Sequence, residues 1–192
     1  MTLHLDLLRH GETERGGGFR GSLDDQLTEQ GWAQMRVALD GRKGWARIVS
    51  SPLQRCARFA SELAGRLQIP LHLDARLSEL HFGAWEGRSA AALMDTEADA
   101  LGQFWRDPYE FTPPDGEPVA AFAQRVLLAI DDLHRQFAGQ SVLLVSHAGV
   151  MRLLLARARG LPREQLLQVE VAHAALFALR VTGPAPLCLV EP

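Results

Sequence analysis

The sequence predicts an α/β fold of three layers, α/β/α, with a largely parallel central sheet. Short apolar runs of strand length alternate with longer segments of helical periodicity, which is typical of a sheet built from β-α units. Two of these runs, near residues 3–8 and 142–146, end in a histidine with a glycine next to it or nearly so. Parallel strands present their carboxyl ends at one edge of the sheet, where ligands bind. We therefore expect one site built from both ends of the chain.

The predicted elements alternate along the whole chain. We expect strands near residues 3–8, 46–49, 71–73, 142–146 and 174–181, and helices near 28–39, 52–67, 89–106, 118–137 and 149–158. The second helix has the clearest start, because Ser50 and Ser51 can supply an N-cap and Pro52 suits a first helical position. Gly139 is placed to end the fourth helix. Residues 108–116 are rich in proline and end in Asp-Gly, which predicts a loop.

Composition indicates an ordinary globular protein. The chain has 192 residues, of which 47% are apolar and 22% charged, and we expect one domain over residues 1–192. A formal net charge of −3 argues against a general nucleic-acid or acidic-membrane binder. We find no cationic segment ahead of an apolar stretch at the N-terminus and no run of membrane-spanning length. These features favour a cytoplasmic location.

The cysteines predict neither a disulfide framework nor a zinc site. Cys56 and Cys188 are the only two, and they lie far apart in the sequence. We expect two buried thiols in a reducing compartment.

Candidate chemistry gathers at the predicted strand ends. Arg9 and His10 follow the first strand, Arg55 lies at the start of the second helix, and His147 follows a later strand. Guanidinium groups match phosphate oxygens and stay charged. Imidazole can act as a nucleophile or transfer a proton near neutral pH. The four side chains together predict a pocket for a dianion, most simply a phosphate.

Competing uses of these residues find less support. The sequence has no H-E-x-x-H motif, no paired cysteines and no histidine cluster, so no metal site is expected. The G-x-S-x-G motif of serine hydrolases is also absent. We interpret the remaining histidines outside the acid block as structural, namely His4, His72, His134 and His173.

Residues 7–13, with the sequence LLRHGET, resemble the signature of the histidine phosphatase superfamily, which includes the phosphoglycerate mutases. Four further blocks resemble the family in the same order: residues 50–56, 77–87, 114–117 and 146–149. Five ordered matches are far more specific than any one of them. The resemblance covers nearly the whole chain and implies a phosphoglycerate mutase-like fold.

The resemblance also implies a mechanism. His10 would attack the substrate phosphorus and become a phosphohistidine, while Arg9, Arg55 and His147 hold the phosphoryl oxygens. Glu79 would protonate the leaving alkoxide and then take a proton from the hydrolytic water. No metal and no cofactor are implied, because the arginines neutralise the phosphoryl charge.

The identity of the acid has alternatives in the sequence. A carboxylic acid that works near neutral pH needs a raised pKa, to which the apolar neighbours of Glu79 could contribute. Glu86 and Glu12 are the other candidates, and the block match favours Glu79.

One position departs from the family pattern. Relatives often carry a phosphate-binding asparagine a few residues after the R-H-G motif, where this chain has Arg15 and three glycines, residues 16–18. We assign Arg20 and the adjoining Gly21 to substrate binding in its place. Glycine N–H groups of the loop could serve the same purpose.

The glycine-rich segment suggests a substrate. Residues 16–28, followed by Gly31 and Trp32, resemble short bacterial α-ribazole phosphatases of cobalamin nucleotide-loop assembly. The partner would then be a small phosphorylated metabolite, a nucleotide-like phosphomonoester. Trp105 and Tyr109 could form an aromatic wall for its flat base, or simply pack a helix onto the core.

Other activities stay open at this point. A broad-specificity phosphatase, a phosphoglycerate mutase, a phosphoprotein phosphatase and a non-catalytic relative that only binds phosphorylated ligands are the alternatives. The chain lacks the longer insertions associated with cofactor-dependent mutases, which favours hydrolysis. The sequence leaves the oligomeric state undetermined.

Overall fold

A computed structural model describes residues 1–182 and 188–191 of the chain. Its centre is a six-stranded sheet in the order β3-β2-β4-β1-β5-β6. The strands are β1 (Leu3–Arg9), β2 (Arg47–Ser50), β3 (Leu71–Leu73), β4 (Ser141–Ser146), β5 (Leu176–Thr182) and β6 (Cys188–Val190). The first four are parallel to one another, whereas β5 and β6 pair antiparallel. The predicted largely parallel sheet is confirmed.

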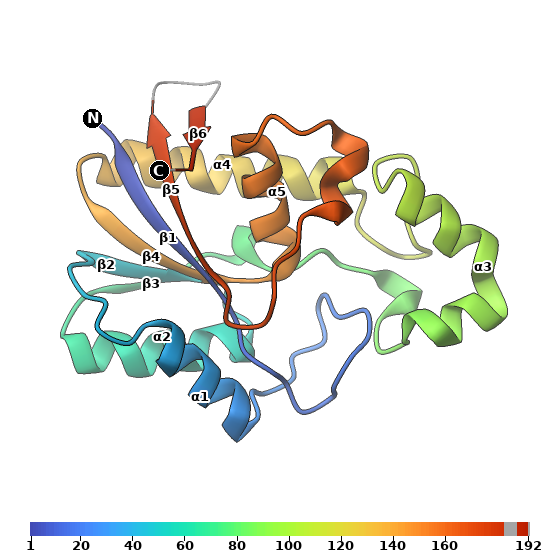
Figure 1. The fold of residues 1–192 in the computed structure, drawn as a ribbon, viewed down its shortest axis with the longest axis horizontal. Coiled ribbons are helices and arrows are strands. Elements are labelled where there is room, and N and C mark those ends of the chain that lie inside the picture. The colour runs from blue at the N-terminus through green and yellow to red at the C-terminus, as the bar shows by residue number, and fades with distance from the viewer. Residues whose placement is uncertain (183–187, 192) are drawn as a thin grey trace.

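Helices cover both faces of this sheet, as Figure 1 shows. On one side lie α1 (Glu29–Ala38) and α2 (Gln54–Leu67), and on the other lie α4 (Val119–Phe137) and α5 (Ala148–Ala158). The remaining helix, α3 (Ala90–Arg106), sits at one end of the molecule, beyond the sheet. Three layers result, as the alternation of patterns predicts.

Side-chain alternation along the strands builds two cores. Leu7 and Leu144 join the cluster beneath α4 and α5, whereas Leu8 and Val145 join the cluster beneath α1 and α2. Successive strand residues point to opposite faces of a sheet. Both faces are covered, and β4 is accordingly apolar from Val142 to Val145, whereas β1 carries His4 and Asp6 between its leucines.

The register of the parallel strands sets the position of the site. Arg9 pairs with Ser146 and Ser50 pairs with Val145, so β1, β2 and β4 end at the same level. The residue after each strand therefore emerges at one edge, as expected for the carboxyl ends of parallel strands.

The start of the second helix differs from the prediction. Instead of beginning at Pro52, α2 begins at Gln54, and its N-cap residue Leu53 makes no side-chain cap bond. The backbone N–H of Ser51 bonds the Val145 carbonyl oxygen, so the chain stays extended beyond β2. The first helical N–H, on Gln54, is instead satisfied by Asp24 Oδ1 at 2.6 Å.

Other boundaries agree within one or two residues, and the exceptions are short elements. The sequence did not predict β6 or the three short 3-10 helices at Ala75–Leu77, Gly83–Trp85 and Arg163–Gln168. A segment of three to six residues leaves little room for a periodic pattern, although the three-residue β3 was predicted correctly. Within the described residues, no helix has the length and apolarity needed to cross a bilayer.

The prediction of buried thiols is tested by the structure for one of the two cysteines. Cys56 is a buried free thiol, as expected. The side chain of Cys188 lies outside the part of the chain that the structure describes, so its burial stays a prediction.

Two glycines allow the N-terminus of α1 to touch the loop after β1. A Cβ added to Gly11 would lie 2.2 Å from the carbonyl oxygen of Gly31, and one added to Gly31 would lie 2.1 Å from that of Glu12. Both distances are far below van der Waals contact. The glycine of the R-H-G motif thus permits a backbone contact that fixes the loop carrying His10.

Gly31→Ala should destabilise the protein by about 1–3 kcal/mol through overpacking, although alanine normally favours a helix. The matched control is Gly65→Ala in α2, where an added Cβ meets nothing within 4 Å. That change should stabilise the protein by about 0.5–1 kcal/mol. Urea unfolding of both variants measures the two effects, and a Gly31→Ala variant as stable as wild type would contradict the contact.

Candidate active site

A cavity of about 600 Å³ opens where β1 and β4 end. Its polar lining includes four arginines and one carboxylate, so a ligand inside it meets a positive potential. The residues that line it are Arg9, His10, Gly18, Phe19, Arg20, Arg55, Glu79, Phe82, Ala90, Phe104, Trp105, Ala148, Arg152, Leu167, Gln168 and His173.

The imidazole of His10 is neutral and leaves one ring nitrogen without a proton. Its Nδ1 lies 2.8 Å from the carbonyl oxygen of Gly11, so Nδ1–H donates and Nε2 carries the lone pair. Burial lowers the pKa of His10 well below 6.5, and the charge of Arg55 lowers it further. The ring therefore keeps its lone pair at neutral pH, which nucleophilic attack requires.

Arg55 is buried and held on several sides. Its Nη1 donates to the Leu23 carbonyl oxygen at 2.6 Å and its Nη2 to that of Gly21 at 2.9 Å. Its Nε lies 3.3 Å from Nδ1 of His147. A guanidinium always donates, so His147 Nδ1 is the acceptor and the imidazole carries its proton on Nε2.

His147 lies behind the cavity wall. It is fully buried and does not line the cavity, and its Nε2 lies 2.7 Å from Ser51 Oγ. Burial and the charge of Arg55 lower the pKa of His147 well below its usual value. Its ring centroid is 5.4 Å from that of His10. The structure thus shows His147 orienting Arg55, and its direct phosphoryl contact stays a prediction.

Arg9 lines the cavity with a donor to spare. Its Nη1 bonds the Val171 carbonyl oxygen at 2.6 Å, while its buried Nε has no partner in the described part of the chain. Burial lowers the pKa of Arg9 to about 10, and the negative charge of Glu79 opposes this shift. The group stays cationic at neutral pH. An unpaired buried donor is costly to the folded state.

Glu79 is the one carboxylate on the cavity wall among the described residues. Its oxygens lie 3.0 and 3.1 Å from the N–H of Gly149, in the first turn of α5, and Oε1 also accepts from Leu80 N–H at 3.0 Å. The apolar setting expected from the sequence is therefore incomplete, since backbone amides hold the carboxylate. They orient it toward the cavity.

Neither alternative acid lines the cavity. Glu86 accepts hydrogen bonds from Ser22 and from the backbone N–H groups of Leu23 and Phe82. Glu12 lies against Thr28. Glu86 thus fixes the loop after Gly21 rather than facing a substrate.

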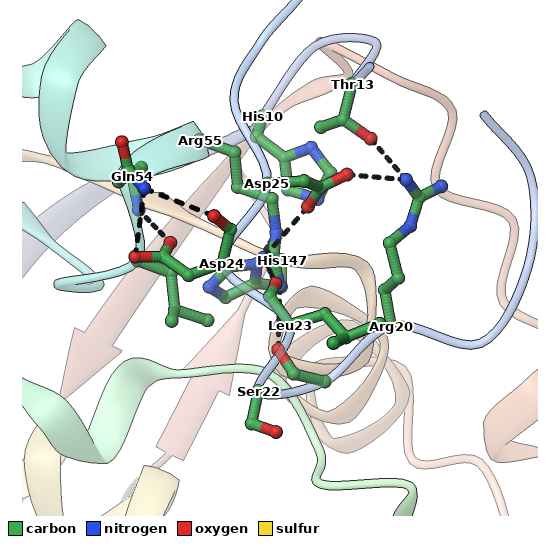
Figure 2. Close-up of polar contacts among 12 residues, drawn as sticks. His10, Thr13, Arg20, Ser22, Leu23, Asp24, Asp25, Gln54, Arg55 and His147 are labelled. Atoms are coloured by element: carbon green, nitrogen blue, oxygen red, sulfur yellow. Dashed lines mark hydrogen bonds and ion pairs between the residues drawn. The ribbon is translucent and has the colours of Figure 1, made fainter. Parts of the chain in front are cut away.

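The loop that departs from the family pattern brings Arg20 to the cavity. Nη1 of Arg20 lies 2.5 Å from Thr13 Oγ1 and 2.6 Å from Asp25 Oδ2 (Figure 2). Gly21, which we also assigned to the substrate, does not line the cavity. Its carbonyl oxygen supports Arg55, and a Cβ there would lie 2.1 Å from the Leu80 carbonyl oxygen.

The outer part of the cavity is aromatic. Phe19, Phe82, Phe104 and Trp105 line it, and Trp105 is 47% exposed. Tyr109 does not reach the cavity, because it packs at the edge of the core with the Arg163 guanidinium 5.9 Å from its ring. Of the two residues predicted to form an aromatic wall, Trp105 therefore lines the cavity and Tyr109 does not.

Two further residues of the cavity, a histidine and an arginine, were missed from the sequence. His173, interpreted as structural, lines the cavity with its ring 5.9 Å from that of His10. It lies in an irregular loop, where no pattern could indicate its direction. Arg152 lies four residues after Ala148 in α5, and both line the cavity. That helical spacing is a signal that could have identified Arg152.

The fold and the cationic cavity at its strand ends define an α/β enzyme of the phosphatase type. The chain matches the family model of the histidine phosphatase superfamily (branch 1) over residues 5–190, and it belongs to that superfamily.

Relatives within the family carry different substrate names. The chain is 31% identical over 183 residues to the adenosylcobalamin/alpha-ribazole phosphatase of Salmonella typhimurium. This match covers 93% of this chain and 91% of that protein. The structure of Bacillus stearothermophilus YhfR superposes with a TM-score of 0.86 at 29% identity, over 98% of this chain and 95% of that one. The structure of a mycobacterial glucosyl-3-phosphoglycerate phosphatase in complex with inorganic phosphate superposes with a TM-score of 0.83 at 27% identity. The match covers 98% of this chain and 95% of that one.

The state of His10 can be checked by titration. Because burial and Arg55 lower its pKa, the ring should stay neutral as the pH falls through 6.5 and take up a proton only in more acidic solution. Imidazole nitrogen shifts of ¹⁵N-histidine-labelled protein measure this, with His10→Ala assigning the signal. A midpoint at or above 6.5 would contradict the neutral nucleophile.

Proposed function

We propose that this protein is a phosphomonoesterase that works through a phosphohistidine at His10, and that it hydrolyses α-ribazole 5′-phosphate. The observation that carries the proposal is the neutral His10 ring, with Nε2 unprotonated, in a cavity whose wall includes Arg9, Arg20, Arg55 and Arg152. Membership of the histidine phosphatase superfamily supports the same chemistry.

In the first step, Nε2 of His10 attacks the phosphorus and the bond to the alcohol oxygen breaks. The guanidinium groups of Arg9 and Arg55 neutralise the charge on the transferred phosphoryl oxygens. Glu79, in its acid form, gives its proton to the departing alkoxide. The products of this step are the free alcohol, a phosphohistidine and a Glu79 carboxylate.

In the second step, water hydrolyses the phosphohistidine. The Glu79 carboxylate takes a proton from the water as its oxygen bonds to phosphorus, and the P–N bond breaks. This restores His10 with its Nε2 lone pair, Glu79 in its acid form, and inorganic phosphate. Backbone amides of Leu80 and Gly149 hold one carboxylate for both steps.

The proposal of the substrate depends on the aromatic residues that line the cavity. An aromatic wall that includes Phe104 and the half-exposed Trp105 suits a flat base attached to the phosphorylated sugar. The similarity to the Salmonella alpha-ribazole phosphatase supports this choice.

A second candidate is a phosphomonoester with another anionic group, such as a glycerate. Arg20 and Arg152 add positive charge to the cavity beyond Arg9 and Arg55. The likeness to a mycobacterial glucosyl-3-phosphoglycerate phosphatase supports this alternative.

Glu79→Gln should separate the two steps. With an aryl phosphate, whose leaving group needs no proton, attack by His10 continues while hydrolysis loses its base. An acid-labile phosphoenzyme should then accumulate in a rapid-quench experiment, whereas alkyl phosphates should lose about 10²–10⁴-fold in turnover. Glu12→Gln is the matched control and should behave as wild type. If the change slowed phosphoenzyme formation equally with aryl and alkyl phosphates, Glu79 would not be the acid for the leaving group.

The substrate is tested by kcat/KM values for α-ribazole 5′-phosphate, ribose 5-phosphate and 3-phosphoglycerate. We expect α-ribazole 5′-phosphate to exceed ribose 5-phosphate by about tenfold or more, since a stacked base adds roughly 1–3 kcal/mol. Trp105→Ala should narrow this ratio. A preference for 3-phosphoglycerate would favour the second candidate instead.

A further inference from the structure

We propose that Asp25 is a positioning residue of the phosphate site. Its carboxylate joins Arg20 to Arg55 and holds Arg20 where its remaining N–H groups bind the phosphoryl group of the substrate. The proposal rests on the phosphatase function above and adds a residue outside the family blocks that the sequence shows.

The Asp25 carboxylate is buried between two guanidinium groups. Its side chain is 1% exposed, Oδ2 lies 2.6 Å from Arg20 Nη1, and Oδ1 lies 3.4 Å from Arg55 Nη1. Figure 2 shows the carboxylate between the two arginines, with His10 and His147 close by. A charged carboxylate is taken out of water at high cost unless cations pair with it. Here one oxygen serves each arginine.

Arg20 keeps part of its guanidinium for a ligand. Nη1 is occupied by Asp25 and by Thr13 Oγ1. Its Nε and Nη2 make no hydrogen bond within residues 1–182 and 188–191, and the side chain lines the cavity that contains His10. A guanidinium held at one nitrogen presents its other N–H groups in a fixed direction, which favours bidentate contact with phosphate oxygens.

The two arginines depend on Asp25 to different degrees. Arg55 also donates to the carbonyl oxygens of Leu23 and Gly21 and to His147. Arg20 has only the Thr13 hydroxyl besides Asp25, within the described residues. Without the negative charge of Asp25, the two cations repel each other, and Arg20 is the one able to move. Asp25 therefore acts on the phosphate through Arg20.

The loop between Arg20 and Asp25 is itself anchored. The Glu86 carboxylate accepts from Ser22 N–H and Oγ–H, each at 2.8 Å, and from Leu23 N–H at 3.0 Å. Both ends of the Arg20–Asp25 pair thus belong to a segment of fixed backbone. This makes the pair a preorganised part of the cavity wall rather than a mobile surface ion pair.

The test is a double-mutant cycle on the binding of inorganic phosphate, measured by calorimetry. Asp25→Asn should weaken binding about tenfold or more, as expected for a lost charge-assisted contact. In an Arg20→Ala background, the same change should have little further effect. Glu62→Gln is the matched control: it makes the same chemical change in an exposed carboxylate paired with Arg36 at 3.0 Å. Its phosphate affinity should equal that of wild type.

Several outcomes would overturn the inference. Wild-type affinity in Asp25→Asn would do so, and so would an equal loss with and without Arg20, which indicates an effect through Arg55 or the fold. If Asp25→Asn does not fold, Arg20→Lys provides the test, because it keeps the charge but loses the planar fork and should weaken phosphate about as much. Wild-type affinity in Arg20→Lys would overturn the proposal.

The inference and the proposed function fail separately. A protein that shows the predicted coupling between Asp25 and Arg20 but hydrolyses no phosphomonoester would keep the phosphate site and reject the phosphatase proposal. Normal turnover with phosphate affinity unchanged in Asp25→Asn would reject the role of Asp25 alone. A wild-type protein that hydrolyses phosphomonoesters but does not bind phosphate at millimolar concentration would reject the inference and leave the proposed function in place.

Discussion

The buried guanidinium of Arg55 is the constraint on which the site depends. A cation that is 1% exposed must find its hydrogen-bond partners in the protein, because water cannot supply them. It finds them in the glycine-rich loop and in His147, so one side chain ties together the end of β4, the start of α2 and a loop of otherwise irregular structure. This need fixes the positions of its partners. Burial lowers the pKa of both neighbouring imidazoles, and the charge of Arg55 lowers it further.

The proposed nucleophile and the proposed acid are held in different ways. Burial, together with the charge of Arg55, lowers the pKa of His10, whereas the Glu79 side chain lies at the N-terminus of α5 and accepts backbone N–H groups. A helix N-terminus holds a carboxylate without a charged partner. The cavity can therefore keep its arginines for the ligand instead of neutralising them with its own acid.

The sequence predicts the inner part of this site better than its outer part. Arg9, His10 and Glu79 follow from strand ends and an ordered set of blocks, and parallel register guarantees that strand ends meet. The helix α2 begins two residues later than predicted, because the chain stays extended at Ser51 and Asp24 caps the helix from a distant loop. The Ser51 hydroxyl contacts His147 as well as the Leu53 N–H. His173 was missed because loops have no period from which to infer the direction of a side chain.

The order of strands in the sheet has a consequence for synthesis. β1 is made first, yet its two neighbours are β4 and β5, which follow more than half of the chain later. While the chain grows on the ribosome, β1 has two open edges, and such edges invite wrong pairing. The loop with His10 acquires its backbone partner, Ser146, only when β4 docks. The loop with His10 is therefore completed only after β4 has been made, and contacts of such long sequence separation form slowly.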